Sequence, residues 1–277
     1  MLETHRQERE TLLQRAVLLL EQDPNVAAAW LFGSLGRGSS DDMSDIDLFV
    51  VMDTPNSAEN ANSVNATSAD MAVHLTHMAE LGPPLLILDA PQNAPPHGAY
   101  HMTLYEGQFG PHQVDWYWQP RAFACIPQQT RLLFDRVGLP VSDSPPHFDY
   151  QPVPERDPYE VCAQRVNFFW VMLLIAAKYA ARDPHSLTMG LLQWTVKPLM
   201  ETRHFADTGS ADLGDTSVFE AIPCPTPADK LRLLRDLAAE MEQLMPRVAA
   251  LGIRVPNAIV LPAHRYLDFI AALIIPT

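Results

Sequence analysis

Cysteine is scarce in this chain of 277 residues, and its scarcity excludes two classes of protein. Cys125, Cys162 and Cys224 are odd in number and widely spaced, and they form neither a C-x-x-C pair nor the spacing of a metal finger. A disulfide scaffold and a cysteine-based zinc module are therefore excluded. This usage is typical of core thiols in a protein of a reducing compartment.

Basic residues are also few: 19 Lys and Arg stand against 33 Asp and Glu, which gives a formal net charge of -14. Proteins that bind a nucleic-acid backbone neutralise its phosphates with Lys and Arg, so this balance argues against a nucleic-acid partner. A neutral or cationic small molecule fits the charge better.

Long apolar runs are missing as well. No run reaches the roughly 18 residues of a membrane span, and the charged, amphipathic start of the chain has no signal-peptide core. We therefore expect a cytoplasmic protein with no membrane partner. The composition, with 47% hydrophobic and 19% charged residues, is that of a globular protein long enough for one large domain or two ordinary ones.

The first 140 residues alternate between helix and strand patterns. Apolar residues recur at helical spacing until Asp23-Pro24, which predicts a helix over residues 4–22. The polar segment 53–70 reads as a loop, and a helix is expected over residues 71–80. Strands are expected at residues 26–32, 46–52, 85–88, 100–105 and 114–118. These elements predict a mixed β-sheet with flanking helices.

Prolines mark a second shift, because six of them lie within residues 139–158 and discourage regular structure. We place the domain boundaries there: a first domain at residues 1–140, a linker at 141–158 and a second domain at 159–277. Helical patterns follow at residues 159–182, 186–201, 227–251 and 262–275. The predicted fold class is α+β, with an N-terminal mixed sheet followed by a C-terminal helical bundle.

The stretch LFGSLGRGSSDDMSDIDLFVV, residues 31–51, places two carboxylates where an apolar strand begins. Asp45 and Asp47 are two positions apart, so on a strand they share a face and their charges repel. Magnesium between them would remove the conflict, because Mg²⁺ prefers hard oxygen ligands and substrate phosphates. Gly33-Ser34 fits the same chemistry, since glycine lets a phosphate approach the backbone and the serine hydroxyl can hydrogen-bond it.

The pattern Gly33-Ser34, ten residues, then Asp45-Ile46-Asp47 resembles the signature of the polymerase-β-type nucleotidyltransferases. The stretch GSLGRGSSDDMSDIDLFVV is similar to that of antibiotic nucleotidyltransferases such as the kanamycin and lincosamide enzymes. Three weaker similarities follow in the same order, and their sequences are AYHMTLYEGQFGPHQVDWYW, NFFWVMLLIAAKYAARDPHSL and LGIRVPNAI. The resemblance implies an N-terminal nucleotidyltransferase domain and a C-terminal helical substrate-binding domain, with both substrates in a cleft between them.

This resemblance implies a reaction. A nucleoside monophosphate, most simply AMP from ATP, would move to a hydroxyl of a small molecule such as a lincosamide or an aminoglycoside, with Mg²⁺ as cofactor and pyrophosphate as product. Two alternatives stay open: a protein side chain as acceptor, as in antitoxin-like relatives, or a nucleotide-binding protein without activity. The acceptor, the nucleotide, the general base and the oligomeric state, a homodimer included, are not fixed by the sequence.

The resemblance also implies roles for residues. Asp45, Asp47 and Asp115, which lies in the expected strand 114–118, would be the catalytic carboxylates that hold the metal. Asp115 is the default general base, with Glu106 as an alternative, because the helix FFWVMLLIAAKYAA lacks the glutamate that some relatives use. Lys178 would contact the nucleotide phosphates, or else snorkel at the edge of a bundle.

Four further residues are candidates for binding the nucleotide: Gly33, Ser34, Arg37 and Ser44. Arg37 could touch a phosphate or be solvated. Ser44 could instead satisfy a local turn, and Asp41 and Asp42 are interpreted as loop charges that cap a turn.

Histidines and aromatic residues suggest weaker alternatives. His74, His77, His97, His101 and His112 raise a zinc hypothesis, but no H-E-x-x-H spacing occurs, and His74 and His77 are expected on the surface. In the segment 116–118, with Trp116, Tyr117 and Trp118, one ring is expected to face the cleft and stack on a substrate.

Overall fold

The structure is a computed structural model that describes residues 1–53, 68–144, 157–182, 185–210 and 226–274. The chain forms two compact units, the first made of Met1–Gly107 and His112–Pro154 and the second of Gln108–Pro111 and Glu155–Thr277. Most of the predicted linker, residues 145–156, lies outside the described residues, as do residues 54–67 of the predicted loop. The domain boundaries taken from the sequence stay a prediction.

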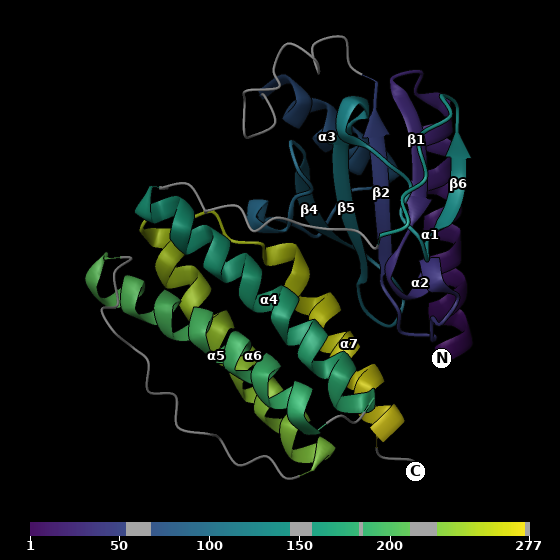
Figure 1. Cartoon of the computed structure of the whole chain (residues 1–277). Helices are drawn as coiled ribbons and strands as arrows, with labels where there is room; N and C mark the ends of the chain where they lie inside the picture. The colour runs from purple at the N-terminus through teal and green to yellow at the C-terminus, as the bar shows by residue number, and fades with distance from the viewer. Residues whose placement is uncertain (54–67, 145–156, 183–184, 211–225, 275–277) are drawn as a thin grey trace. The chain divides into compact units, whose positions relative to one another are not determined.

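The first unit is built on one six-stranded mixed sheet with the strand order β3-β4-β5-β2-β1-β6 (Figure 1). The strands pair antiparallel except at the centre, where β2 and β5 run parallel. The strands are β1 Val26–Leu31, β2 Ile46–Met52, β3 Leu86–Asp89, β4 Ala99–Tyr105, β5 His112–Pro120 and β6 Arg131–Asp135. The helices of this unit are α1 Leu2–Gln22, α2 Gly33–Arg37 and α3 Ser68–Leu81.

The two faces of the central strands differ in what they bury. The side chains of Ile46, Leu48, Val114 and Trp116 enter a core shared with apolar residues of α1 and α3. The opposite face carries a smaller aromatic core around Trp30 and Phe49, whose rings stack at 4.5 Å. Because strand side chains alternate, Asp45, Asp47 and Asp115 fall on this second face.

The second unit consists of four long helices: α4 Pro158–Arg182, α5 His185–Thr208, α6 Pro227–Ala250 and α7 Val260–Ile274 (Figure 1). The helix α4 packs against the other three, and its apolar run 168–177 lies mostly buried among them. Within this unit Gly110 has no room for a side chain, since a Cβ there would lie 2.4 Å from Cβ of Tyr266. Phe109 stacks on Phe269 beside it.

By length and composition alone, α4 is a candidate for a membrane span in the described part of the chain. Of its most apolar 18-residue window, 56% is buried inside the protein, and the core helix of a soluble protein passes the same test.

The predicted α+β fold class is confirmed. The sequence missed β6, an edge strand whose first residues Arg131 and Leu132 are exposed and show no alternation of polar and apolar residues. It also ended α5 too early, at residue 201 instead of Thr208. The expectation of core thiols fits Cys162, which is buried, but is wrong for Cys125, which is exposed, and Cys224 lies outside the described residues.

Candidate active site

Three carboxylates meet on one face of the sheet in the first unit. Asp47 on β2 is the register partner of Asp115 on β5, and partners on parallel strands direct their side chains to the same face. Asp45 directly precedes β2 and shares that face because it lies two positions before Asp47. The structure therefore brings together the three aspartates that were predicted from widely separated parts of the sequence.

Burial and the negative charge of these aspartates raise the pKa of two neighbouring tyrosines. Burial raises the pKa of the Tyr117 hydroxyl well above its usual value, and the charges of Asp115, Asp47 and Asp45 raise it further. Tyr100 is the register partner of Tyr117 on β4, and burial and Asp115 likewise raise its pKa. The charges of all three carboxylates thus act on the pKa of Tyr117, and both phenols stay protonated at neutral pH.

Asp115 is held on two sides. The side-chain amide of Gln113, two residues earlier on β5, donates hydrogen bonds to both Asp115 oxygens at 3.0 and 3.1 Å. The Tyr100 hydroxyl donates another. Asp115 is only 7% exposed, so these donors offset part of the cost of burying its charge. Asp45 and Asp47, in contrast, are half-buried.

Gly33 touches the carboxylate of Asp47. Its φ is +61°, and an added Cβ would lie 1.9 Å from Asp47 Oδ2. The amide of Phe32 donates to the backbone oxygen of Asp47 at 3.2 Å, which draws the two segments together. Only glycine combines this φ with this close approach. Ser34 follows half-buried in α2, and Arg37 is exposed in its last turn.

Ser44 closes a turn just before the carboxylates. Its hydroxyl donates to Asp41 Oδ1 at 2.9 Å and accepts from the Asp41 amide at 2.9 Å. The Arg9 guanidinium donates to the carbonyl oxygens of Asp41 and Ser44 at 2.6 and 3.2 Å. Asp42 forms an exposed ion pair with Arg6. The contacts of Ser44 are those of a turn residue, and its role toward a nucleotide stays a prediction.

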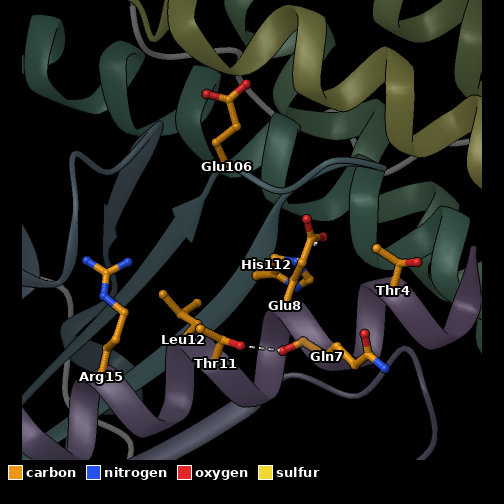
Figure 2. Close-up of a pocket in the computed structure, with 8 residues that line it drawn as sticks. All are labelled: Thr4, Gln7, Glu8, Thr11, Leu12, Arg15, Glu106 and His112. Atoms are coloured by element: carbon orange, nitrogen blue, oxygen red, sulfur yellow. Dashed lines mark hydrogen bonds and ion pairs between the residues drawn. The ribbon is translucent and has the colours of Figure 1, made fainter.

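Lys178 and Glu106 lie in different units. Lys178 is 6% exposed within α4 of the second unit, with its Nζ 6.0 Å from the Tyr179 ring centroid. Glu106 follows β4 in the first unit and lines a cavity of about 270 Å³ with Glu8, Arg15 and His112 (Figure 2). The contact of Lys178 with a nucleotide and the base role of Glu106 stay predictions.

The expected surface position of two histidines was wrong. His74 and His77 are not on the surface but 4% and 5% exposed, because α3 turns them onto the sheet, where both contact the Trp118 ring. Trp116 and Trp118 are each 1% exposed in the main core and offer no ring to a ligand. Of the three aromatic residues, only the half-buried Tyr117 lies on the face of the aspartates.

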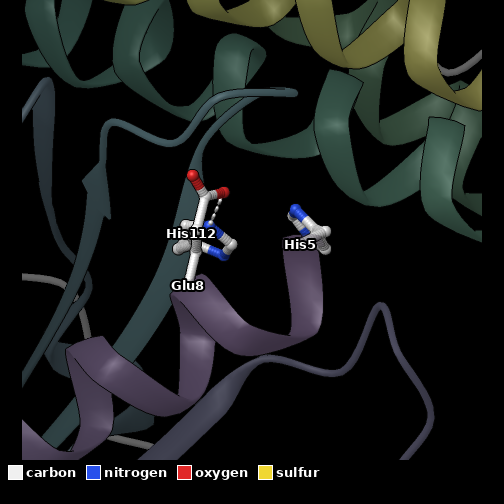
Figure 3. Close-up of side chains that lie close together, drawn as sticks. All are labelled: His5, Glu8 and His112. Carbon is white, nitrogen blue, oxygen red and sulfur yellow. Dashed lines mark hydrogen bonds and ion pairs between the residues drawn. The ribbon is translucent and has the colours of Figure 1, made fainter. Parts of the chain in front are cut away.

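A second group of metal-binding side chains was missed. His5, Glu8 and His112 are the one set of three or more His, Cys, Asp or Glu residues in the described chain whose ligand atoms all lie within 4.8 Å of one another (Figure 3). A local signal was present, since His5 and Glu8 stand at i and i+3 on one helix face, but their pairing with His112 needs the fold.

Comparisons with known proteins give a family match for part of the first unit. Residues 14–90, which include β1, α2, β2 and the residues Gly33, Ser34, Asp45 and Asp47, match the family model "Polymerase beta, Nucleotidyltransferase". A search of curated proteins gave no match. The solved structure of the CdnC:HORMA-deltaN complex of E. coli MS115-1 matches 97% of this chain and 91% of that chain at 14% identity, with a TM-score of 0.28. Residues 14–90 of the first unit thus match a nucleotidyltransferase domain of the polymerase-beta family.

Proposed function

We propose that this protein transfers a nucleoside monophosphate, AMP from ATP in the simplest case, to a hydroxyl of a small molecule in a Mg²⁺-dependent reaction that releases pyrophosphate. The observation that carries the proposal is the register of Asp47 opposite Asp115, with Asp45 on the same face and Gly33 against the Asp47 carboxylate. The match of residues 14–90 to the nucleotidyltransferase model supports the reaction class.

The donor set fits magnesium. All three side chains are carboxylates, and Mg²⁺ is commonly held by one or two carboxylates together with substrate phosphates. Asp45, Asp47 and Asp115 would hold it, and the half-buried state of Asp45 and Asp47 leaves them accessible to a nucleotide. Bound there, the ion would neutralise charge on the phosphates and stabilise the leaving pyrophosphate.

The chain itself positions the reactants. Gly33 presents backbone without a side chain beside Asp47, and Ser34 adds a hydroxyl next to it, which suits a phosphate group. Gln113 and Tyr100 fix the orientation of Asp115. The acceptor oxygen would attack the α-phosphorus in line, its proton would pass to Asp115, and the bond to the pyrophosphate oxygen would break.

We assign acceptor recognition to the helical unit, together with contact of Lys178 with the nucleotide phosphates. A lincosamide or an aminoglycoside is the acceptor class that the sequence resemblance favours. Similarity of the C-terminal part of the chain favours a lincosamide, but the buried rings of Trp116 and Trp118 would not contact it. The net charge of -14 suits a polycationic aminoglycoside. We further propose a cytoplasmic protein that binds neither nucleic acid nor membranes, and a homodimer remains one of its candidate states.

Pyrophosphate release measured with each of the four nucleoside triphosphates across a panel of aminoglycosides and lincosamides tests the proposal. We expect turnover that requires both Mg²⁺ and one acceptor class. An aminoglycoside should lose apparent affinity as salt shortens the Debye length from about 10 Å to about 3 Å, whereas a lincosamide should change little. Absence of turnover with every drug would refute the antibiotic acceptor. Pyrophosphate release with a protein acceptor would then keep the reaction and change its substrate.

A further inference from the structure

We propose that His5, Glu8 and His112 form a binding site for a transition-metal ion of the zinc class, which joins helix α1 to strand β5. This site shares no residue with the group of three aspartates, and the proposal does not depend on the nucleotidyl-transfer reaction. Its two imidazoles and one carboxylate are a donor set that suits zinc, whereas magnesium prefers oxygen alone.

The spacing of the ligand atoms fits one ion. Nε2 of His112 and Oε2 of Glu8 are 3.2 Å apart. Around a tetrahedral zinc ion, with bonds of roughly 2.0–2.2 Å, neighbouring ligand atoms lie about 3.3 Å apart. All three ligand atoms lie within 4.8 Å of one another, and Figure 3 shows His5 and Glu8 on α1, with His112 beside Glu8. Rotation of the side chains, which opens the stack of the two imidazoles, would bring the three ligand atoms around one ion.

The site is also open on one side. His5 and His112 are buried and their rings stack at 4.3 Å, while Glu8 is half-buried. Glu8 and His112 line the cavity of about 270 Å³ that Glu106 also faces (Figure 2). Three protein ligands beside a cavity leave a fourth position for water or a small ligand, which is the arrangement of zinc sites that are not fully enclosed.

The position of the site suggests what the ion would do. Helix α1 also carries Arg9, which holds the turn that leads into Asp45. Strand β5 carries Asp115 three residues after His112. An ion between α1 and β5 would fix both elements and thereby the carboxylates that follow them, a structural role that adds stability because the site exists only in the folded chain.

Isothermal titration of the chelator-treated full chain with Zn²⁺, in excess Mg²⁺ to fill the hard-oxygen site, tests this inference. We expect about one equivalent of tightly bound zinc and a rise in Tm on the order of 5 °C at free zinc near 100 times Kd. Co²⁺ in the same site should show the visible d–d bands of a four-coordinate ion.

Two variants and a control make the test specific. His5→Phe keeps the ring stack and Glu8→Gln keeps a hydrogen-bond partner for His112, yet each should weaken zinc binding at least about tenfold, since loss of even an outer-shell partner typically costs 10–100-fold. His77→Phe is the matched control: His77 is a buried histidine paired with the Asp23 carboxylate at 3.0 Å but belongs to no group of three ligands. Zinc binding that is absent from the native chain, or equal in Glu8→Gln and the native chain, would overturn the site. If His5→Phe does not fold, Glu8→Gln decides alone.

Discussion

The two units bury different kinds of side chain. The first unit buries five histidines, His5, His74, His77, His101 and His112, together with Arg9 and Asp115. The buried polar residues described in the second unit are Thr195 and Thr202, whose hydroxyls donate to carbonyls one turn earlier in the same helix, and the lysines Lys178 and Lys230. The other buried residues described in the helical unit are apolar.

This difference indicates where in the protein the reactive side chains lie. Buried titratable groups are costly, so a fold that retains many of them in one place commonly uses them. In the first unit they gather around β5, which carries His112, Asp115 and Tyr117. The described helical unit buries two ionisable side chains, Lys178 and Lys230, and these are the residues at which the difference between the units can be tested.

Acidification should produce the largest difference in stability between the two units. The pKa values of His5, His74 and His112 are lowered to about 3, about 3 and about 4, each chiefly by burial. Unfolded histidine titrates near 6.5, so between about pH 6.5 and 4 the unfolded chain binds protons that the folded chain does not. The first unit should lose roughly 1.4 kcal/mol per pH unit for each of these histidines as the pH falls.

Hydrogen exchange of the EDTA-treated chain at pH 7 and pH 5, analysed separately for the two units, measures this loss. Protection of the first unit should fall, after correction for the intrinsic exchange rate, while that of the second stays close to its value at pH 7. Equal loss in both units would contradict the assignment of the acid-sensitive groups to the first.

Gly33→Ala should have the next largest effect. The new Cβ would meet Asp47 Oδ2 at 1.9 Å in a backbone with φ +61°, so both the strain and the clash act on the candidate site. We expect a loss of about 2–3 kcal/mol in stability and a loss of most turnover. Gly38→Ala is the matched control, because Gly38 has φ +71° but nothing within 4 Å of its Cβ position.

Urea unfolding and steady-state turnover of the two variants give the comparison. Gly38→Ala should cost about 1 kcal/mol and leave turnover near normal. If Gly33→Ala behaved like Gly38→Ala, the close approach of Gly33 to Asp47 would have no part in the reaction.

Lys178→Met tests whether the helical unit takes part in nucleotide binding. Loss of a charge-assisted contact with a phosphate costs about 1.5–3 kcal/mol, or roughly a 10–100-fold weaker Kd. Lys230→Met provides the control, because Lys230 is buried in α6 of the same unit. Calorimetry with a non-hydrolysable nucleotide should show weaker binding for Lys178→Met alone, and an unchanged Kd would return Lys178 to a structural role.

Tyr100→Phe should produce the smallest change. It removes one donor to Asp115 but leaves the two hydrogen bonds from Gln113, so we expect a several-fold loss of turnover, equal to about 1 kcal/mol. Tyr105→Phe on the same strand is the control, since the Tyr105 hydroxyl donates to the Met78 carbonyl at 2.9 Å. Equal turnover of the two variants would show that Tyr100 does not position Asp115.

The parts of the fold with strong local signals were predictable. The apolar run after Asp45 and the Asp-x-Asp spacing located β2 at Ile46–Met52, the same bounds that the structure has. The pattern of residues 114–118 placed Asp115 on a strand and the resemblance gave it a role, but its register opposite Asp47 comes from a parallel pairing of distant segments that no local pattern encodes.

The side chains that the sequence misplaced or missed share one physical cause, which is contact between segments that lie far apart in the sequence. His74 and His77 looked exposed because a polar residue on a helix usually is, yet α3 buries that face against the sheet. Trp116 and Trp118 alternate with Asp115 and Tyr117, and only the position of α1 and α3 decides which set is covered. The group of His5, Glu8 and His112 needs α1 and β5 to meet, which lies beyond any window of sequence.

Pyrophosphate release by Asp47→Asn in the presence of Mg²⁺, ATP and an acceptor that the native chain uses tests the central claim most directly. We expect turnover to fall at least about 100-fold. The Tm should stay level or rise, because one of several neighbouring like charges is removed. Near-normal Mg²⁺-dependent turnover in Asp47→Asn would exclude Asp47 as a ligand of the catalytic metal.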